Sequence, residues 1–297
     1  MKSTLYLLAL SAIVAVSVVA QEPRPPLASD ARTRDVYVSV VDSRKVPVKG
    51  LTAADFSVRE DTVSREVLRA VPASGPLDVV LLADDSQAAT QSIPYLREGL
   101  TKFIDRLQGK AAIGIVTIGE RPTSVAERTT DVAALKKGVS RIFARPGSGA
   151  YLLEGILDVS RGFQKREAAR PVIVALTFEG IEYSNAAYER VLDELQKSGA
   201  ALHVLSIGTP AGQVTDEIRN KNVVIAQGTE ASGGRREQLL AEMALPEALV
   251  KVADELLSQY VVTYSRPESL VPPEKLKVTV NKAGLTARAR TRLLNRR

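Results

Sequence analysis

The chain has 297 residues, of which 45% are hydrophobic and 25% charged, and its formal net charge is +6. It contains no Cys and a single His, His203, so disulfides, thiolate chemistry, Cys-based zinc sites, a His-based catalytic triad and His-rich metal clusters are excluded. Trp is absent and aromatic residues make up 4%, so we expect a core of Val, Leu, Ile and Ala, as in buried parallel strands.

The first twenty residues have the pattern of a secretory signal. Lys2 is followed by an apolar run that ends in small residues, which predicts cleavage after Ala20. An uncleaved membrane anchor is the alternative, although the run is short for a full span. Residues 21–33 are rich in proline and predict a flexible leader. We therefore predict an exported protein, periplasmic or extracellular, with no membrane span after signal cleavage.

Two segments at the ends of the mature chain alternate with period two. Val36, Val38 and Val40 alternate with other residues near the start, and similar strands return after residue 260. Chain ends commonly lie close together in domains. We predict that residues 34–72 and 260–294 pair into one small β-sandwich domain.

The middle of the chain, residues 76–259, has a different pattern. Continuous apolar runs alternate with amphipathic segments, and the first of these segments has one apolar face formed by Ile93, Leu96, Leu100, Phe103, Ile104 and Leu107. This alternation predicts an α/β domain with a doubly wound, mostly parallel sheet and helices on both faces. Residues 222–237 could hold one more strand and a glycine turn.

The C-terminal residues 288–297 carry much of the excess positive charge. Their basic residues alternate with apolar ones and no aromatic residue accompanies them. Binding of nucleic acid would favour stacking side chains beside the charges. We therefore predict a solvated strand end and no nucleic-acid partner.

The most informative motif follows the first apolar run, where Asp84, Asp85 and Ser86 stand together. Paired acids after a strand resemble the start of a response-regulator receiver domain, in which they hold Mg²⁺ beside a phosphorylated Asp. The next strand, "IGIVTIGERP", ends without the Asp that such a domain needs, and the late strand "VLSIGTPAG" lacks the Lys. A receiver domain is therefore disfavoured.

A second resemblance extends over nearly all of the exported chain. The motif "PLDVVLLADDS" resembles the first strand and loop of a von Willebrand factor type A domain, which begins a metal-ion-dependent adhesion site. Five segments in order resemble the von Willebrand factor type A-related family described in acidobacteria: Val40–Asp61, Pro76–Ser86, Ala231–Glu237, Leu249–Pro267 and Leu276–Arg290.

The resemblance implies five ligand positions for a divalent ion, and this sequence fills them incompletely. Asp84 and Ser86 match the first loop, but the second Ser falls on Ala88. The Thr of the second loop falls on Ala150, and Glu179 takes the acidic place of the third loop. Mg²⁺ needs six oxygens in octahedral geometry, whereas Ca²⁺ tolerates irregular shells. The site is therefore predicted to be degenerate, with no resident cofactor expected and Mg²⁺ or Ca²⁺ as the weak alternative.

Ligands of open α/β sheets bind at the carboxyl ends of the strands. The side chains predicted there for a protein partner are Asp85, Gln87, Ser148, Tyr151 and Glu182. The resulting hypothesis is an exported, non-catalytic protein-interaction module of the adhesion or scaffold type, whose partner the sequence does not identify.

Two alternatives remain open at this point. The first is an adhesion or sensor domain in which Asp84, Ser86 and Glu179 still hold Mg²⁺ or Ca²⁺. The second is a hydrolase that uses Asp84 and Glu179 as an acid/base pair. The absence of GxSxG and P-loop motifs disfavours an enzyme.

Overall fold

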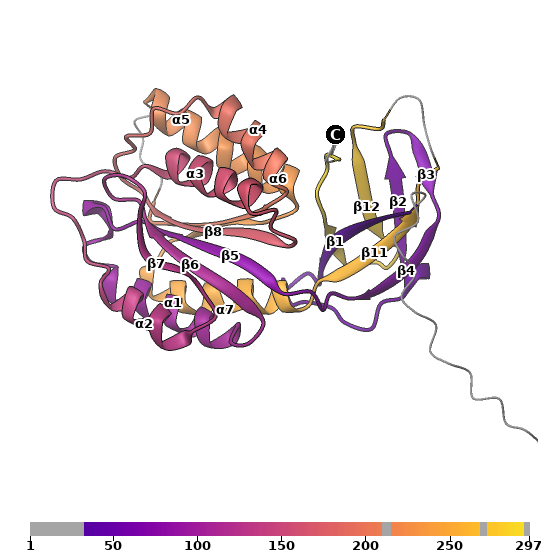
Figure 1. Ribbon diagram of the computed structural model, residues 1–297, viewed down its shortest axis with the longest axis horizontal. Helices are drawn as coiled ribbons and strands as arrows, with labels where there is room; N and C mark the ends of the chain where they lie inside the picture. Colours follow the sequence, from indigo (N-terminus) through magenta and orange to yellow (C-terminus); the bar gives the residue numbers. More distant parts are fainter. Residues whose placement is uncertain (1–32, 210–214, 268–271, 294–297) are drawn as a thin grey trace, which may run out of the picture. The chain divides into compact units, whose positions relative to one another are not determined.

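The computed structural model describes residues 33–209, 215–267 and 272–293 (Figure 1). The predicted signal peptide, and the predicted leader up to residue 32, lie outside these residues. Within the described part of the chain, none of the helices combines the length and the apolar character that a bilayer crossing requires. The strands are β1 Thr33–Val41, β2 Phe56–Glu60, β3 Val63–Arg65, β4 Val67–Pro72, β5 Leu77–Ala83, β6 Ala111–Thr117, β7 Thr123–Thr129, β8 Pro171–Phe178, β9 Ala201–Ile207, β10 Arg236–Leu239, β11 Tyr260–Ser265, β12 Leu276–Val280 and β13 Thr286–Arg288.

A six-stranded sheet forms the centre of the α/β part, in the order β10-β9-β8-β5-β6-β7. Neighbouring strands are parallel except for β7, which pairs antiparallel with β6 at one edge. All residues of β5 and β8 are buried, as expected for strands covered on both faces. The predicted doubly wound, mostly parallel sheet is confirmed, and it aligns the loops after β5, β6 and β8 at one edge.

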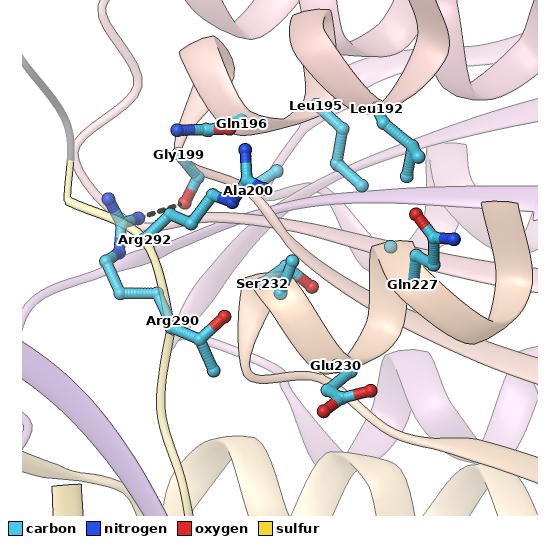
Figure 2. Close-up of a pocket in the computed structure, with 13 residues that line it drawn as sticks. Leu192, Leu195, Gln196, Gly199, Ala200, Gln227, Glu230, Ser232, Arg290 and Arg292 are labelled. Carbon is cyan, nitrogen blue, oxygen red and sulfur yellow. Dashed lines mark hydrogen bonds between the residues drawn. The ribbon is translucent and has the colours of Figure 1, made fainter. Parts of the chain in front are cut away.

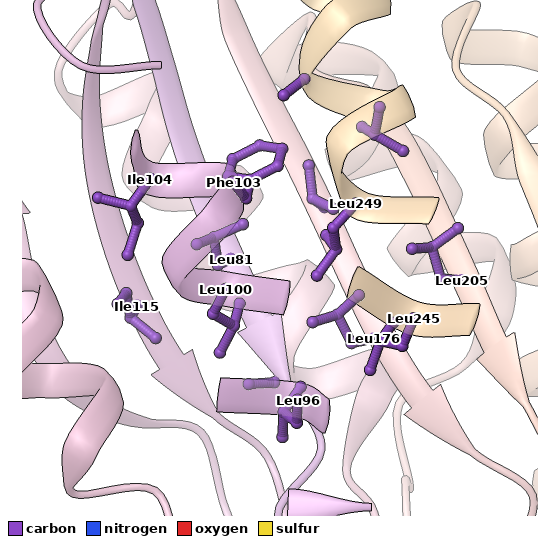
Figure 3. Close-up of a cluster of buried hydrophobic side chains, with 14 of the residues drawn as sticks. Leu81, Leu96, Leu100, Phe103, Ile104, Ile115, Leu176, Leu205, Leu245 and Leu249 are labelled. Atoms are coloured by element: carbon purple, nitrogen blue, oxygen red, sulfur yellow. The ribbon is translucent and has the colours of Figure 1, made fainter. Parts of the chain in front are cut away.

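Helices cover both faces of this sheet (Figure 1). They are α1 Ile93–Arg106, α2 Val132–Ser140, α3 Leu152–Lys165, α4 Tyr188–Ser198, α5 Asp216–Val223, α6 Thr229–Ser232 and α7 Leu245–Leu257. On one face α1 and α7 pack on the sheet through a cluster that includes Leu96, Leu100 and Leu249 (Figure 3). A Cβ on Gly99 would lie 2.8 Å from Leu249 Cδ1, so glycine permits the close approach of α1 and α7. The opposite face has a second core, which contains Ile156 of α3 and Leu195 of α4.

The strands from both ends of the chain form two antiparallel sheets, with the orders β13-β1-β11-β4 and β12-β2-β3. β1 pairs with β11, placing Val36 opposite Val262, and β2 pairs with β12. Their shared core contains Val38, Phe56 and Tyr264. Pairing of the N-terminal with the C-terminal strands into a sandwich is therefore confirmed. The described residues belong to one compact unit, so the exact domain boundaries at residues 72–76 and 259–260 stay a prediction.

The segment 222–237, which the sequence allowed to hold one more strand and a glycine turn, is helical in its first part and enters a strand only at its end. The helix α5 runs to Val223, a π-helical turn covers residues 224–228, and α6 follows directly. The strand β10 begins only at Arg236, after two glycines. A Cβ on Gly234 would lie 1.9 Å from the carbonyl oxygen of Leu202, so the close approach to β9 requires glycine there. The apolar residues Val224 and Ile225 pack in the second core as part of this helical stretch.

Candidate functional site

Asp84 lies directly after β5 and is fully buried. Its Oδ1 accepts a hydrogen bond from the backbone N–H of Ser86 at 2.9 Å, and its Oδ2 accepts one from Phe178 at 3.0 Å. Burial raises the pKa of Asp84 above its ordinary value, and these two amides offset only part of that rise. The carboxylate therefore ties the loop after β5 to the end of β8.

Asp85 is also buried, and it is neutralised by a residue that the sequence analysis did not single out. Its Oδ1 accepts from the N–H of Gly119 at 2.7 Å, and its Oδ2 lies 2.9 Å from Nε of Arg145. The guanidinium also contacts Glu120 at 2.9 Å. The hydrogen bond that Arg145 donates to Asp85 is the largest cause that raises the pKa of Arg145. The side chain of Asp85 is thus held within the protein.

Gln87 lies in the first loop, which follows β5, and Ser148 lies in the second loop, which connects α2 to α3. Hydrogen bonds join these two loops. The backbone N–H of Gln87 donates to the carbonyl of Ser148 at 3.4 Å, and Gln87 Oε1 accepts from the N–H of Gly147 at 2.7 Å. The Ser148 hydroxyl donates to the carbonyl of Arg145. Both residues predicted for the partner-binding edge therefore take part in contacts between loops.

Ala88 and Ala150 lie where the loops meet. A Cβ placed on Gly180 would be 2.6 Å from the Cβ of Ala88, so the first and third loops touch there. Ala150 donates its N–H to the carbonyl of Ile181 and accepts from the N–H of Tyr183, both at 2.8 Å. The three loops thus converge, and these two positions bring methyl groups to the junction.

Glu182 pairs with Ala150 in an isolated β-bridge between the second and third loops, and it is 4% exposed. Its Oε1 accepts from the N–H of Leu152, the first residue of α3, at 3.0 Å, and from the Ser184 hydroxyl at 2.5 Å. Its Oε2 has no hydrogen-bond partner among the described residues. Burial raises the pKa of Glu182 to about 7. The group is therefore close to half ionised at neutral pH.

Glu179 lies farther along the same edge. Its Cβ and Cγ are 3.3 and 3.4 Å from the position that a Cβ on Gly208 would take, so the side chain packs beside the loop after β9. Within the described ranges, no hydrogen bond or ion pair joins Glu179 to Asp84 or Ser86. The sequence therefore places two acids in this loop, and within the described part of the chain the structure brings neither into a hydrogen bond with Asp84.

The residues present fit a tightly held divalent ion poorly. Both Asp84 oxygens accept backbone N–H groups, and Ala88 and Ala150 bring no oxygen to the place where the loops meet. Over residues 33–209, 215–267 and 272–293, no group of three or more His, Asp or Glu side chains is arranged to hold a metal ion. Water would have to fill most of an octahedral shell.

The same edge exposes several large apolar side chains, which the sequence analysis did not predict. Ile181 and Tyr183 of the third loop are 60% and 44% exposed, and the Tyr183 ring lies 6.0 Å from that of Tyr151. Other exposed apolar residues follow α2 and β10: Phe143, Leu240 and Met243. Contiguous exposed apolar groups are typical of interaction surfaces, and Ile181 and Tyr183 are two such groups in one loop.

His203 lies within β9 and is fully buried. Burial lowers its pKa to about 4, so the ring is neutral at neutral pH. Glu255 of α7 is the charge that opposes this shift, while Arg235 and Arg288 add to it. The position is that of a packed strand residue, away from the loops described above.

Comparison with known proteins identifies the fold family. A family model for the von Willebrand factor type A domain matches residues 78–232, more than half of the chain. The chain belongs to the von Willebrand factor type A domain family. The match begins within β5 and ends with α6, so it contains all three loops of the candidate site.

Solved structures with a similar fold share little sequence with this chain. A von Willebrand factor type A protein from Catenulispora acidiphila has 13% identity and a TM-score of 0.49, with 89% of this chain and 73% of that protein covered. Proximal thread matrix protein 1 from the mussel byssus, solved with a zinc-occupied metal-ion-dependent adhesion site, has 16% identity and a TM-score of 0.51. That match covers 67% of this chain and 49% of the mussel protein. A search of curated proteins finds no match.

Proposed function

We propose that this chain is an exported, non-catalytic protein-interaction module whose docking edge works without a divalent ion. The type A fold is consistent with an interaction role, since a solved structure of similar fold, proximal thread matrix protein 1, is a matrix protein. The export part of the proposal comes from the signal pattern of the first twenty residues, which lie outside the described part of the chain. The five sequence segments quoted above support assignment to the type A-related subfamily.

The observation that carries the proposal is that the acidic side chains at this edge accept hydrogen bonds from the protein itself. Asp84 accepts two backbone N–H groups, Asp85 is bound by Gly119 and Arg145, and Glu182 caps the start of α3. Both oxygens of Asp84 and of Asp85 are satisfied in this way, so these carboxylates stabilise loops and do not need a cation. Glu182 Oε2 has no partner among the described residues, and burial raises the pKa of this group and favours its neutral form. What the edge offers to a partner is its apolar side chains.

The geometry gives no support to the hydrolase alternative. An acid/base pair must reach the same substrate atoms. Asp84 is fully buried and hydrogen bonded to backbone, while Glu179 packs beside Gly208. The proposed activity is therefore binding alone.

A comparison of variants in pull-down experiments tests the proposal. The full chain, Ile181→Asp and Val63→Asp would be used as baits on an exported fraction, each in EDTA and in Mg²⁺ with Ca²⁺. Val63 lies on β3, is 50% exposed, and serves as a matched control for Ile181, which is 60% exposed. We expect one set of partners with the parent in both buffers, lost with Ile181→Asp and kept with Val63→Asp. Loss of the partners in EDTA, or their retention by Ile181→Asp, would contradict the proposal.

A further inference from the structure

A second feature of the molecule is a cavity at the amino end of β9. Its volume is about 270 Å³, and it lies between α4, the segment of residues 227–232 and the C-terminal residues 290–292 (Figure 2). The C-terminal segment is held there by a hydrogen bond from the N–H of Thr291 to the carbonyl of Ala231, at 2.9 Å. The cavity is at the opposite end of the parallel strands from the candidate site described above.

One wall of the cavity is apolar. Leu192 and Leu195 of α4 line it, together with Ala200 and Gly228. A Cβ on Gly228 would lie 3.2 Å from Leu195 Cδ2 and 3.5 Å from Leu192 Cδ2, so glycine keeps the backbone close to these leucines. The wall suits an aliphatic group.

The other walls carry polar side chains, most of which make no hydrogen bond or ion pair with other described residues. Gln196, Gln227, Glu230 and Arg292 line the cavity, and no side-chain hydrogen bond or ion pair joins them to other residues in the described ranges. Arg290 differs, because its guanidinium donates to the carbonyl of Gly199 at 2.7 Å. In Figure 2 Gln227 and the two arginines lie on opposite sides of the cavity, with the leucines above and Glu230 below. Two carboxamides, a carboxylate and a guanidinium therefore surround one apolar wall.

We propose that this cavity binds the C-terminal end of a peptide whose last side chain is aliphatic. The guanidinium of Arg292 matches an α-carboxylate, which it can hold with two parallel hydrogen bonds. The carboxamides of Gln196 and Gln227 can donate to and accept from a peptide group, and Glu230 can accept from a peptide N–H. The two leucines take the aliphatic side chain.

The size of the cavity sets the length of the ligand that it encloses. At about 270 Å³ it lies just below the ~300–1,000 Å³ range of small-molecule sites, so it encloses little more than the last one or two residues. The rest of a longer peptide would remain outside. This site shares no residue with the edge proposed for partner docking, and either proposal can fail without the other.

Calorimetric titration of the full chain tests the inference with three probes. They are N-acetyl-Gly-Leu as the free acid, the same peptide as its C-terminal amide, and N-acetyl-Gly-Asp as the free acid. We expect saturable binding of the first with a Kd of about 1 mM or below. The other two should bind at least about tenfold more weakly, because one loses the charge-assisted pair with Arg292 and the other the aliphatic contact.

Two arginine variants complete the experiment. Arg292→Gln should bind the free acid no better than the parent binds the amide, while Arg141→Gln, an exposed arginine at the end of α2, should leave the affinity unchanged. No saturable heat with the free acid at about 10 mM would overturn the inference. Equal affinity for acid and amide, or unchanged affinity in Arg292→Gln, would overturn it as well.

Discussion

The two ends of the parallel sheet use their polar side chains in opposite ways. At the carboxyl edge Asp84, Asp85 and Glu182 are buried, and each accepts hydrogen bonds from the protein itself. At the amino end of β9, Gln227 and Arg292 line a cavity without such contacts within the described ranges.

This contrast distinguishes polar residues that stabilise the fold from polar residues that can bind a ligand. A buried carboxylate that accepts two backbone N–H groups has a structural role, because its removal leaves those donors unsatisfied. An exposed polar group that lines an apolar cavity and makes no internal hydrogen bond has no such role and is available to a ligand. A motif that resembles a binding site can therefore be structural, while a set of residues without any motif can bind.

The largest effect is expected for Asp84→Ala. The change leaves the buried N–H groups of Ser86 and Phe178 without acceptors, which should lower the free energy of unfolding by about 2–5 kcal/mol. Urea unfolding in EDTA and in Mg²⁺ measures it. We expect the same loss in both buffers, and a loss that appears only with Mg²⁺ would indicate that Asp84 is a metal ligand.

The second effect is a pH dependence centred on Glu182. Its folded pKa of about 7 lies above the ordinary 4.5, so its contribution to stability is complete below pH 4.5 and is lost as the pH rises through 7. Over this pH range the contribution of Glu182 to the free energy of unfolding changes by about 3 kcal/mol. Glu182→Gln should remove this component, which urea unfolding of both proteins at pH 5 and pH 8.5 would show. Identical pH profiles of parent and variant would refute the assignment.

A smaller effect is expected for Arg145→Gln, which takes away the charged partner of Asp85. The Arg145 side chain is 36% exposed, so solvent screens part of the interaction, and we expect a loss of about 1 kcal/mol. Because Gly119 still binds Asp85, the loop should keep its conformation. Thermal unfolding at low and high salt measures the loss, which should shrink with salt. A salt-independent loss would mean that packing of Arg145 dominates.

The smallest effect is expected at the cavity. Arg292→Gln changes an exposed side chain without hydrogen bonds to the described residues, so the free energy of unfolding should change by less than about 0.5 kcal/mol. Comparing the free energies of unfolding of Arg292→Gln and Asp84→Ala tests directly whether Arg292, unlike Asp84, has no structural role. A loss of 1 kcal/mol or more would show that Arg292 is part of the scaffold.

Most of the fold could be predicted because buried positions in helices and strands are filled by apolar residues at regular spacings in the sequence. The helical face of Leu96, Leu100 and Phe103 is fully buried, and the runs at β5 and β8 are covered on both faces. At residues 222–228 the sequence left the element open, because a short apolar run suits a buried helical turn as well as a strand, and the structure has the helical turn.

The candidate site was less predictable because loops lack a period. The third loop contains Glu179 and Glu182, and only the folded structure shows that Glu182 turns inward to cap α3 while Glu179 packs beside Gly208. Arg145 lies 60 residues from Asp85, and no local pattern links the two. The cavity residues come from three segments spread over about 100 residues of the sequence, so no motif could have indicated them.

The central claim is that the docking edge works without a divalent ion. Calorimetric titration of Mg²⁺, Ca²⁺ and Zn²⁺ into the parent and into Asp84→Ala, with thermal unfolding under the same conditions, tests it most directly. We predict no saturable heat at this site and no ion-dependent rise in Tm for either protein. Saturable binding to the parent that raises its Tm and disappears in Asp84→Ala would contradict the account.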